Sequence, residues 1–256
     1  MKPTQQLHDL GQSLWLDNIT REILANGTLR RYIDELSITG LTSNPSIFDH
    51  AIKNSNFYDD AILQKMKQGK SGEALFFELA IEDLRQAADL FRPIYDRTNG
   101  IDGWVSLEVS PMLAYDTPGT IAEVKQLSAR AERPNLFVKI PGTPEGIPAI
   151  EECIFAGVPV NVTLLFSHEQ YQAAAEAYWR RATHPSGAKS RCLLFGLCIH
   201  QPLGQSDDGE SSRRVAKRAW DRRRQANLQS LSPTARFGAV AATGECRRPA
   251  TTIALG

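Results

Sequence analysis

A lysine lies in the middle of an apolar run near the centre of the chain. The stretch NLFVKIPGT (135–143) places Lys139 between Val138 and Ile140, and Pro141-Gly142 ends the run. A lysine among apolar side chains must reach solvent, pair with an acid, or lose its proton. The first two outcomes are structural. The third gives a nucleophilic amine that attacks carbonyl carbons, because desolvation disfavours the ammonium form.

Five further polar residues lie within or at the end of similar apolar segments. They are two acids, two amides and a hydroxyl: Asp17, Glu108, Asn44, Asn161 and Thr163. In a parallel barrel, the carboxyl ends of the strands meet at one mouth, so these side chains would surround Lys139. Carboxylates there can move protons, and amides can both donate and accept hydrogen bonds.

The segments that carry these residues alternate with amphipathic helices over residues 1–180. We expect strands at 13–17, 38–45, 104–111, 136–141 and 158–167. The expected helices cover 19–36, 71–97 (with Ser71 as cap) and 145–156, and two capping boxes, Thr120 with Glu123 and Ser167 with Gln170, mark two further helix starts.

Apolar strands that alternate with helices predict a parallel sheet covered on its faces. Either a closed barrel or an open doubly wound sheet fits this order. Polar residues concentrated in the strands, and the absence of a glycine-rich phosphate loop after the first strand, favour a (β/α)₈ TIM barrel. Five βα units cannot close eight strands, so we expect a barrel truncated after about five units.

Composition excludes several classes of protein. The chain has 256 residues and a formal net charge of zero, which gives no basis for binding nucleic acid or a membrane surface. It shows no leader and no apolar run of the roughly 18 residues that a transmembrane helix needs. The four cysteines (153, 192, 198 and 246) have no metal-binding or disulfide spacing, so we expect a cytoplasmic protein.

The chain has two compositions that meet near residue 181. Residues 1–180 contain 16 Lys and Arg against 24 Asp and Glu, whereas residues 181–256 contain 13 against 5, and 11 of those 13 are arginine. We therefore divide the chain into a barrel portion at 1–180 and a basic, arginine-rich tail at 181–256.

Five stretches carry a family resemblance. WLDNITR, GLTSNPSIF, SLEVSP, FVKIPGT and VNVTLLFS are similar, in order and spacing, to signature stretches of transaldolase over residues 1 to about 180. The resemblance implies a class I, Schiff-base barrel enzyme, a transferase of the pentose phosphate pathway. Such an enzyme moves a dihydroxyacetone unit from sedoheptulose 7-phosphate to glyceraldehyde 3-phosphate, giving erythrose 4-phosphate and fructose 6-phosphate. Sugar phosphates are then the partners, no metal or cofactor is needed, and a homodimer is possible.

The resemblance also assigns roles to the matching residues. Lys139 falls at the Schiff-base lysine and Asp17 at the general acid/base of carbon–carbon cleavage. Glu108 and Thr163 fall where the family moves protons through a water. The two amides, Asn44 and Asn161, fall where it holds substrate hydroxyls.

Some of these residues have a structural alternative. Asp17 would cap a helix that starts at Asn18, Glu108 would form a salt bridge with Lys139, and Asn44 before Pro45 would form a turn.

The tail departs from the family. A transaldolase continues with a strand whose serine and arginine grip the substrate phosphate, and residues 182–256 show no such strand. Two alternatives to a working transaldolase therefore stay open: an inactive remnant, or a related Schiff-base aldolase such as a fructose 6-phosphate aldolase. The longer segment between the second and third strands, together with Asp17, favours transaldolase over the aldolase.

We predict that the tail is a transaldolase read one base out of frame. AKRAWDRRRQANLQSL (216–231) has synonymous codons that, read one base later, give RNALGIAVGKRTYKA, an amphipathic helix. LFGLCIHQPLGQ (194–205) similarly gives SSVSVFISRWD, an apolar strand followed by serine and arginine. Sequencing the gene should reveal a one-base change near codon 181 that opens a longer transaldolase frame. A natural frame that encodes this tail in a fully active chain would refute the prediction.

Overall fold

The described part of the chain alternates strands and helices, and a helix follows each of the first five strands. The computed structural model describes residues 2–182, 195, 196 and 251–255. The strands are β1 (Gln12–Leu16), β2 (Ile38–Thr42), β3 (Trp104–Glu108), β4 (Leu136–Pro141), β5 (Val160–Thr163), β6 (Phe195–Gly196) and β7 (Thr251–Leu255). The helices are α1 (Pro3–Asp9), α2 (Arg21–Ala25), α3 (Thr28–Leu36), α4 (Pro45–Lys53), α5 (Asp59–Lys67), α6 (Gly72–Arg97), the 3₁₀ turn η1 (Pro111–Leu113), α7 (Thr117–Ala131), α8 (Gly146–Phe155) and α9 (His168–Ala182).

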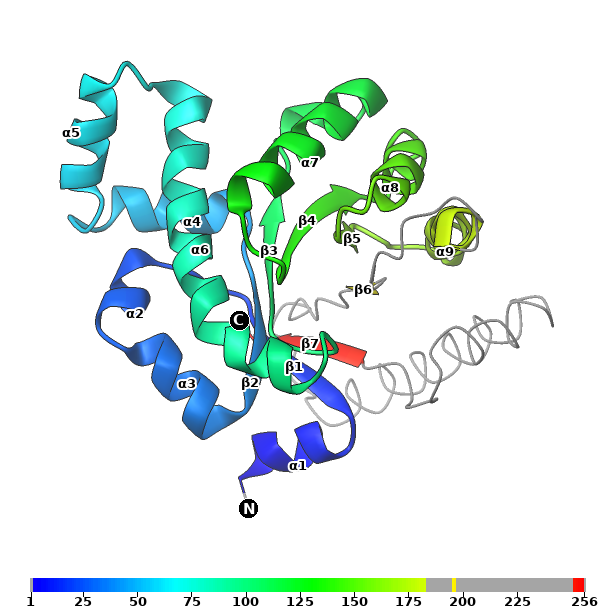
Figure 1. Ribbon diagram of the computed structural model, residues 1–256, viewed down its shortest axis with the longest axis horizontal. Helices are drawn as coiled ribbons and strands as arrows, with labels where there is room; N and C mark the ends of the chain where they lie inside the picture. Colours follow the sequence, from blue (N-terminus) through cyan, green and yellow to red (C-terminus); the bar gives the residue numbers. More distant parts are fainter. Residues whose placement is uncertain (1, 183–194, 197–250, 256) are drawn as a thin grey trace, which may run out of the picture.

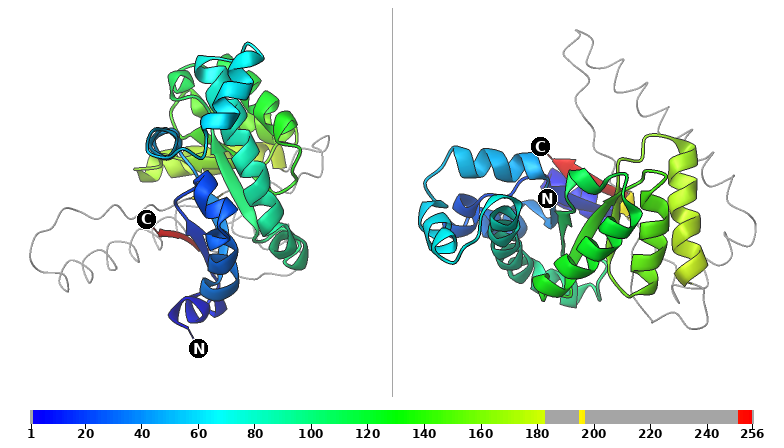
Figure 2. Two further views of the ribbon diagram at one scale, coloured as in Figure 1. Left: turned by 90° about the vertical axis from the view of Figure 1, so that its left-hand side faces the viewer. Right: turned by 90° about the horizontal axis from the view of Figure 1, so that it is seen from above.

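The strands form one parallel sheet in the order β6-β5-β4-β3-β2-β1-β7. Strands β1 to β5 are thus neighbours in chain order, as in a (β/α) barrel. The sheet curls, and α6, α7, α8 and α9 follow one another along its outer side (Figures 1 and 2). The predicted fold, a TIM barrel truncated after about five βα units, is confirmed.

The two faces of the sheet differ in chemistry because side chains alternate along each strand. Outward residues of β4, such as Val138 and Ile140, belong to a large apolar core shared with the helices. On the inner face, Trp15, Trp104 and Phe137 form a separate aromatic cluster. The rings of Trp104 and Phe137 stack with centroids 3.9 Å apart.

Glycine at position 40 makes room for this aromatic cluster. Gly40 pairs with Trp15 on one side and Trp104 on the other. A Cβ atom at this position would collide with the indole of Trp15. Aromatic rings therefore fill one end of the inner face. The polar residues lie nearer the carboxyl ends of the strands.

Three local predictions are wrong. The helix expected over 19–36 is two helices, because Gly27 adopts the left-handed conformation (φ 77°) between α2 and α3. Helix α7 starts at Thr117, capped by Asp116, so Thr120 and Glu123 form no capping box. Ser71 precedes α6, but its side chain makes no capping hydrogen bond.

Two other predictions near helix starts and strand ends have clear outcomes. The capping box of Ser167 and Gln170 is confirmed, because the Ser167 hydroxyl accepts from the Gln170 amide while the Gln170 side chain accepts from the Ser167 amide. Strand β5 is shorter than expected, since Leu164 adopts φ 60° immediately after Thr163.

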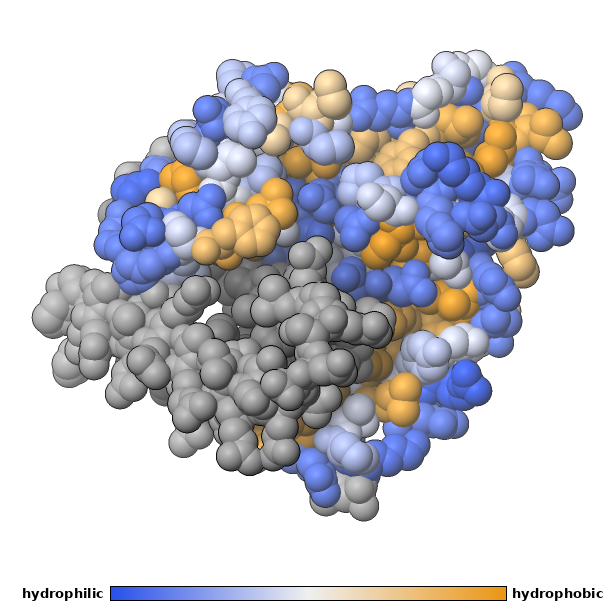
Figure 3. Space-filling view, turned by 180° about the vertical axis from the view of Figure 1, so that it is seen from behind, coloured by the Kyte–Doolittle hydropathy of each residue, from blue (hydrophilic) through white to orange (hydrophobic). Residues whose placement is uncertain are grey.

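On the face opposite to the view of Figure 1, hydrophilic and hydrophobic residues are interspersed over the described surface (Figure 3). Among the helices that the structure describes, none is both long and apolar enough to cross a membrane. Most of the tail (181–256) lies outside the described residues, so its division from the barrel portion and its frameshifted origin stay predictions.

We predict that Phe137→Ala destabilises the chain by about 3–5 kcal/mol, because it removes a fully buried ring from the inner aromatic cluster. The matched control is Phe166→Ala, since Phe166 is 78% exposed, and it should change stability by less than about 0.5 kcal/mol. Urea unfolding followed by circular dichroism measures both. Equal effects would show that the inner face is not a packed core.

Candidate active site

Lys139 lies on the inner face of β4 with its side chain almost wholly buried. The residue is 3% exposed. Its Nζ donates to the Glu108 carboxylate at 3.0 Å and to the Ser43 carbonyl at 3.1 Å. Of the three outcomes open to a buried lysine, pairing with an acid is the one observed. This ion pair was the structural alternative for Glu108, and it also places a proton acceptor beside the amine.

Three candidate residues form a row across adjacent strands. Glu108 on β3 is in register with Lys139 on β4, and Lys139 is in register with Asn161 on β5. Residues in register on parallel strands project from the same face, so all three point inward. The sheet therefore brings an acid, an amine and an amide together from positions 108 to 161.

Asn161 is fully buried, and only half of its amide is used. Its Nδ2 donates to the Ser106 hydroxyl at 2.9 Å. Its Oδ1 is buried and has no hydrogen-bond partner among the described residues. A buried acceptor without a partner costs free energy, so this oxygen is suited to accept a hydrogen bond from a hydroxyl of a ligand.

Ser106 is a residue that the sequence reasoning missed. It lies two positions before Glu108 on β3 and therefore shares its inward face. Its hydroxyl accepts from Asn161, and its carbonyl accepts from the Ser43 hydroxyl at 2.8 Å. The strict alternation within SLE could have identified it, because any residue two positions from an inward acid must also point inward.

Asp17 follows β1 and lies half-buried near Lys139. Burial raises the pKa of its carboxyl above the ordinary 3.8, and the positive charge of Lys139 partly opposes this shift. The alternative that Asp17 caps a helix is wrong. Helix α2 starts at Arg21, and the Thr20 hydroxyl caps it by accepting from the Ile23 amide. Its carboxylate is therefore available for proton transfer.

Asn44 has a structural role, but it caps a helix and does not form the turn that was its alternative. It is the N-cap of α4, and its Oδ1 accepts from the Ile47 amide at 2.9 Å. Only the Nδ2 of Asn44 remains for a ligand. Its neighbour Ser43 supplies the carbonyl that binds Lys139, so the end of β2 is tied directly to the candidate site.

Thr163 ends β5 two residues after Asn161 and therefore points to the same face. It is 5% exposed, and its carbonyl accepts from the Gly142 amide at 2.8 Å. The next residue, Leu164, is branched yet adopts the left-handed conformation. Backbone strain of this kind is common at functional sites.

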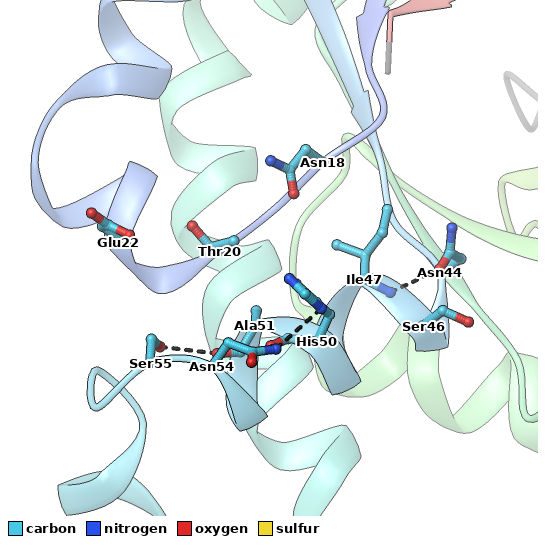
Figure 4. Close-up of a pocket in the computed structure, with 10 residues that line it drawn as sticks. All are labelled: Asn18, Thr20, Glu22, Asn44, Ser46, Ile47, His50, Ala51, Asn54 and Ser55. Atoms are coloured by element: carbon cyan, nitrogen blue, oxygen red, sulfur yellow. Dashed lines mark hydrogen bonds between the residues drawn. The ribbon is translucent and has the colours of Figure 1, made fainter.

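A pocket lies between the β1–α2 loop and α4, and Asn44 alone of the predicted site residues is among the described residues that line it. Its volume is about 530 Å³, and Figure 4 shows the side chains of the β1–α2 loop and of α4 that surround it. Asn18 and Asn44 line it, and each directly follows a residue of the site, Asp17 or Ser43. The described residues contain no group of three or more His, Cys, Asp or Glu that could hold a metal ion.

The arrangement as a whole supports amine chemistry on a polyhydroxy carbonyl compound. It combines a buried amine, an acid paired with it, a second acid with a raised pKa and an unpartnered amide oxygen. These are the groups that imine formation and proton transfer require.

Comparison with known proteins gives a consistent family. The model of the family described as Transaldolase/Fructose-6-phosphate aldolase matches residues 14–201. A transaldolase of Thiobacillus denitrificans is 48% identical over 180 residues, which is 70% of this chain and 50% of the relative. A transaldolase of an Arthrobacter species is 47% identical over 69% of this chain and 47% of its own length. The chain thus spans about half the length of the curated relatives it matches.

We predict that Asp17→Asn stabilises the folded chain at neutral pH. Because burial raises the folded-state pKa of Asp17, its ionised form favours unfolding at pH values above that pKa. The neutral amide removes this cost. The advantage should shrink as the pH falls through the folded-state pKa and should vanish below 3.8, where the carboxyl becomes protonated in both states. Urea unfolding over this pH range measures it.

The control for this prediction is the exposed Asp34. Asp34→Asn should change the free energy of unfolding by less than about 0.5 kcal/mol at neutral pH and throughout this pH range. An Asp17→Asn chain that is less stable than the wild type at neutral pH would contradict the prediction.

Proposed function

The chain belongs to the transaldolase/fructose-6-phosphate aldolase family, and we propose that it carries the Schiff-base part of a transaldolase site. The observation that carries the proposal is the ion pair between the buried Lys139 and Glu108. Asp17 lies close enough for the charge of Lys139 to lower its pKa. Because the chain spans about half of its relatives, the reaction and the substrates are proposed for it rather than established.

The first half of the proposed reaction forms an imine. Glu108 takes a proton from the Lys139 ammonium, and the free amine attacks the C2 carbonyl of a ketose phosphate to give a carbinolamine. Loss of water then yields the protonated imine, with Glu108 and Thr163 moving protons through a water. Burial beside an acid supports this step, because the acid is positioned to accept the proton that makes the amine nucleophilic.

The second half breaks and remakes a carbon–carbon bond. Asp17 takes the proton of the hydroxyl on C4, the C3–C4 bond breaks, and its electron pair moves into the imine to give an enamine while an aldehyde leaves. The enamine then attacks a second aldehyde, Asp17 returns its proton, and water releases the product from Lys139. The raised pKa of Asp17 supports this role, since a carboxyl that titrates nearer neutrality both accepts and returns a proton efficiently.

The amides are proposed to hold the substrate. Asn161 supplies its unpartnered Oδ1 and Asn44 its Nδ2 to substrate hydroxyls. A sugar phosphate is thus the proposed substrate class, with sedoheptulose 7-phosphate or fructose 6-phosphate as donor and no metal or organic cofactor. The cytoplasmic location and the homodimer expected from the sequence stay predictions.

A fructose 6-phosphate aldolase is the second candidate, because the family model includes it. Transaldolase is favoured by the long segment between β2 and β3, which contains α4, α5 and α6, and by the carboxylate of Asp17. Transaldolases of Thiobacillus denitrificans, an Arthrobacter species and Streptomyces coelicolor are 44–48% identical to this chain over the matched residues.

The experiment is borohydride trapping of the full chain with fructose 6-phosphate, followed by peptide mass spectrometry. The wild type should carry a reduced three-carbon unit on Lys139. Lys139→Met should carry none. Asp17→Ala should form the imine but cleave it about 10²–10⁴-fold more slowly, so its adduct should retain all six carbons.

Lys125→Met is the control, because Lys125 is an exposed lysine paired with Glu152, and this variant should label as the wild type does. Label on a lysine other than Lys139, or no label on the wild type, would refute the proposed function for this chain. A three-carbon adduct formed by Asp17→Ala at the wild-type rate would refute the role of Asp17 alone.

A further inference from the structure

The start of α2 is held by a buried polar network formed by Tyr58, which directly precedes α5, and by acids on α6. The Arg21 amide donates to the Tyr58 hydroxyl at 3.0 Å, and its guanidinium Nε donates to Asp83 at 2.8 Å. The guanidinium also lies over the Tyr58 ring, 4.7 Å from its centroid, and contacts Glu82. Both the backbone and the side chain of Arg21 are therefore fixed to residues far away in the sequence.

Tyr58 and Asp83 are the buried centre of this network, and both are fully shielded from solvent. The Tyr58 hydroxyl donates to one Asp83 oxygen at 2.8 Å, and Arg21 donates to the other. Burial raises the pKa of Tyr58, so it stays a hydrogen-bond donor. Burial also raises the pKa of Asp83, and Arg21 opposes that shift. Each member therefore depends on the others for a partner.

Asp17 depends on its backbone for its position. Among the described residues, no donor makes a hydrogen bond to its carboxylate. It lies in the four-residue loop between β1 and α2, and only Ile19 of that loop is anchored in the core. Helix α2 has five residues, too few to stay helical without tertiary contacts. Arg21 is thus the far anchor of the loop that carries Asp17.

We propose that Tyr58 and Asp83 are positioning residues that hold Asp17 over the reacting bond through Arg21. The proposal rests on the proposed function for the role of Asp17, but the network and its effect on the loop do not require catalysis. Loss of the two Tyr58 hydrogen bonds should release the start of α2 and let the Asp17 carboxylate move toward solvent. Lys139, on β4, should keep its contacts with Glu108 and Ser43.

The test is Tyr58→Phe in the full chain, which keeps the buried ring and removes only its hydroxyl. Imine trapping at Lys139 should be unchanged, whereas cleavage of the trapped donor should slow about 10- to 100-fold, since small misplacement of a catalytic group has effects of this size. The pKa of Asp17, measured by carboxyl ¹³C NMR, should fall toward 3.8 as its burial decreases.

Tyr32→Phe is the matched control. Tyr32 is a partly buried tyrosine on α3 that packs against the same core, and among the described residues its hydroxyl has no hydrogen-bond partner. It should change neither cleavage nor the titration of Asp17. A Tyr58→Phe chain with the wild-type Asp17 titration would overturn the proposal, whether or not cleavage slows. Because the titration needs no turnover, an inactive wild type would refute the proposed function and leave this result intact.

Two further measurements cover a Tyr58→Phe chain that fails to fold. Asp83→Asn keeps the shape of the site but removes the charge that holds Arg21, and it should shift the Asp17 titration in the same direction. In the unaltered chain, hydrogen exchange at the Arg21 amide should be much slower than at the exposed Asn18 amide, because Tyr58 accepts from Arg21. Equal exchange at these two amides would overturn the proposal.

Discussion

The burial of one positive charge on β4 constrains the whole arrangement of this molecule. Lys139 is 3% exposed, so its ammonium needs a close negative partner and further acceptors. Glu108 on β3 and the carbonyl of Ser43, the residue after β2, supply them. Removal of one partner from a buried pair typically costs about 3–5 kcal/mol, so the register of β2, β3 and β4 is tied to the site.

The curled sheet makes this burial possible by separating two environments. Its outer face packs apolar side chains against the helices, while its inner face changes from aromatic rings to polar groups along the strands. The rings of Trp15, Trp104 and Phe137 exclude water from the side of the site that faces away from the carboxyl ends of the strands. The polar groups nearer the carboxyl ends of the strands are thus held in a space of low polarity, where charge pairs and hydrogen bonds are stronger.

The same low polarity has a cost in stability. Asp17 is half-buried with a raised pKa, and Asn161 has a buried oxygen without a partner among the described residues. Neither arrangement benefits the folded chain by itself. Groups that are stabilised only when a substrate binds are expected at a functional site, and the rest of the fold must compensate for them.

The sequence alone determined the alternation of strands and helices, the family and the strand that carries Lys139. Alternating polarity in short strands is a local signal, so LFVKIP predicted β4 (Leu136–Pro141) to the residue and placed Lys139 on it. Helix boundaries were predicted less well. Thr120 and Glu123 have the spelling of a capping box, but Asp116 caps α7, while Thr120 donates to the Leu113 carbonyl and Glu123 accepts from the Ser110 amide.

Only the tertiary structure decided which polar residues meet and what each contacts. Strand register joins Glu108, Lys139 and Asn161, and it assigns Ser106 to Asn161 and the Ser43 carbonyl to Lys139. The network of Arg21, Tyr58 and Asp83 joins positions up to 62 residues apart. A sequence pattern reports which face a residue prefers, but it contains no distances between segments. Those distances follow from the curl of the sheet and from the packing of α2 against α6.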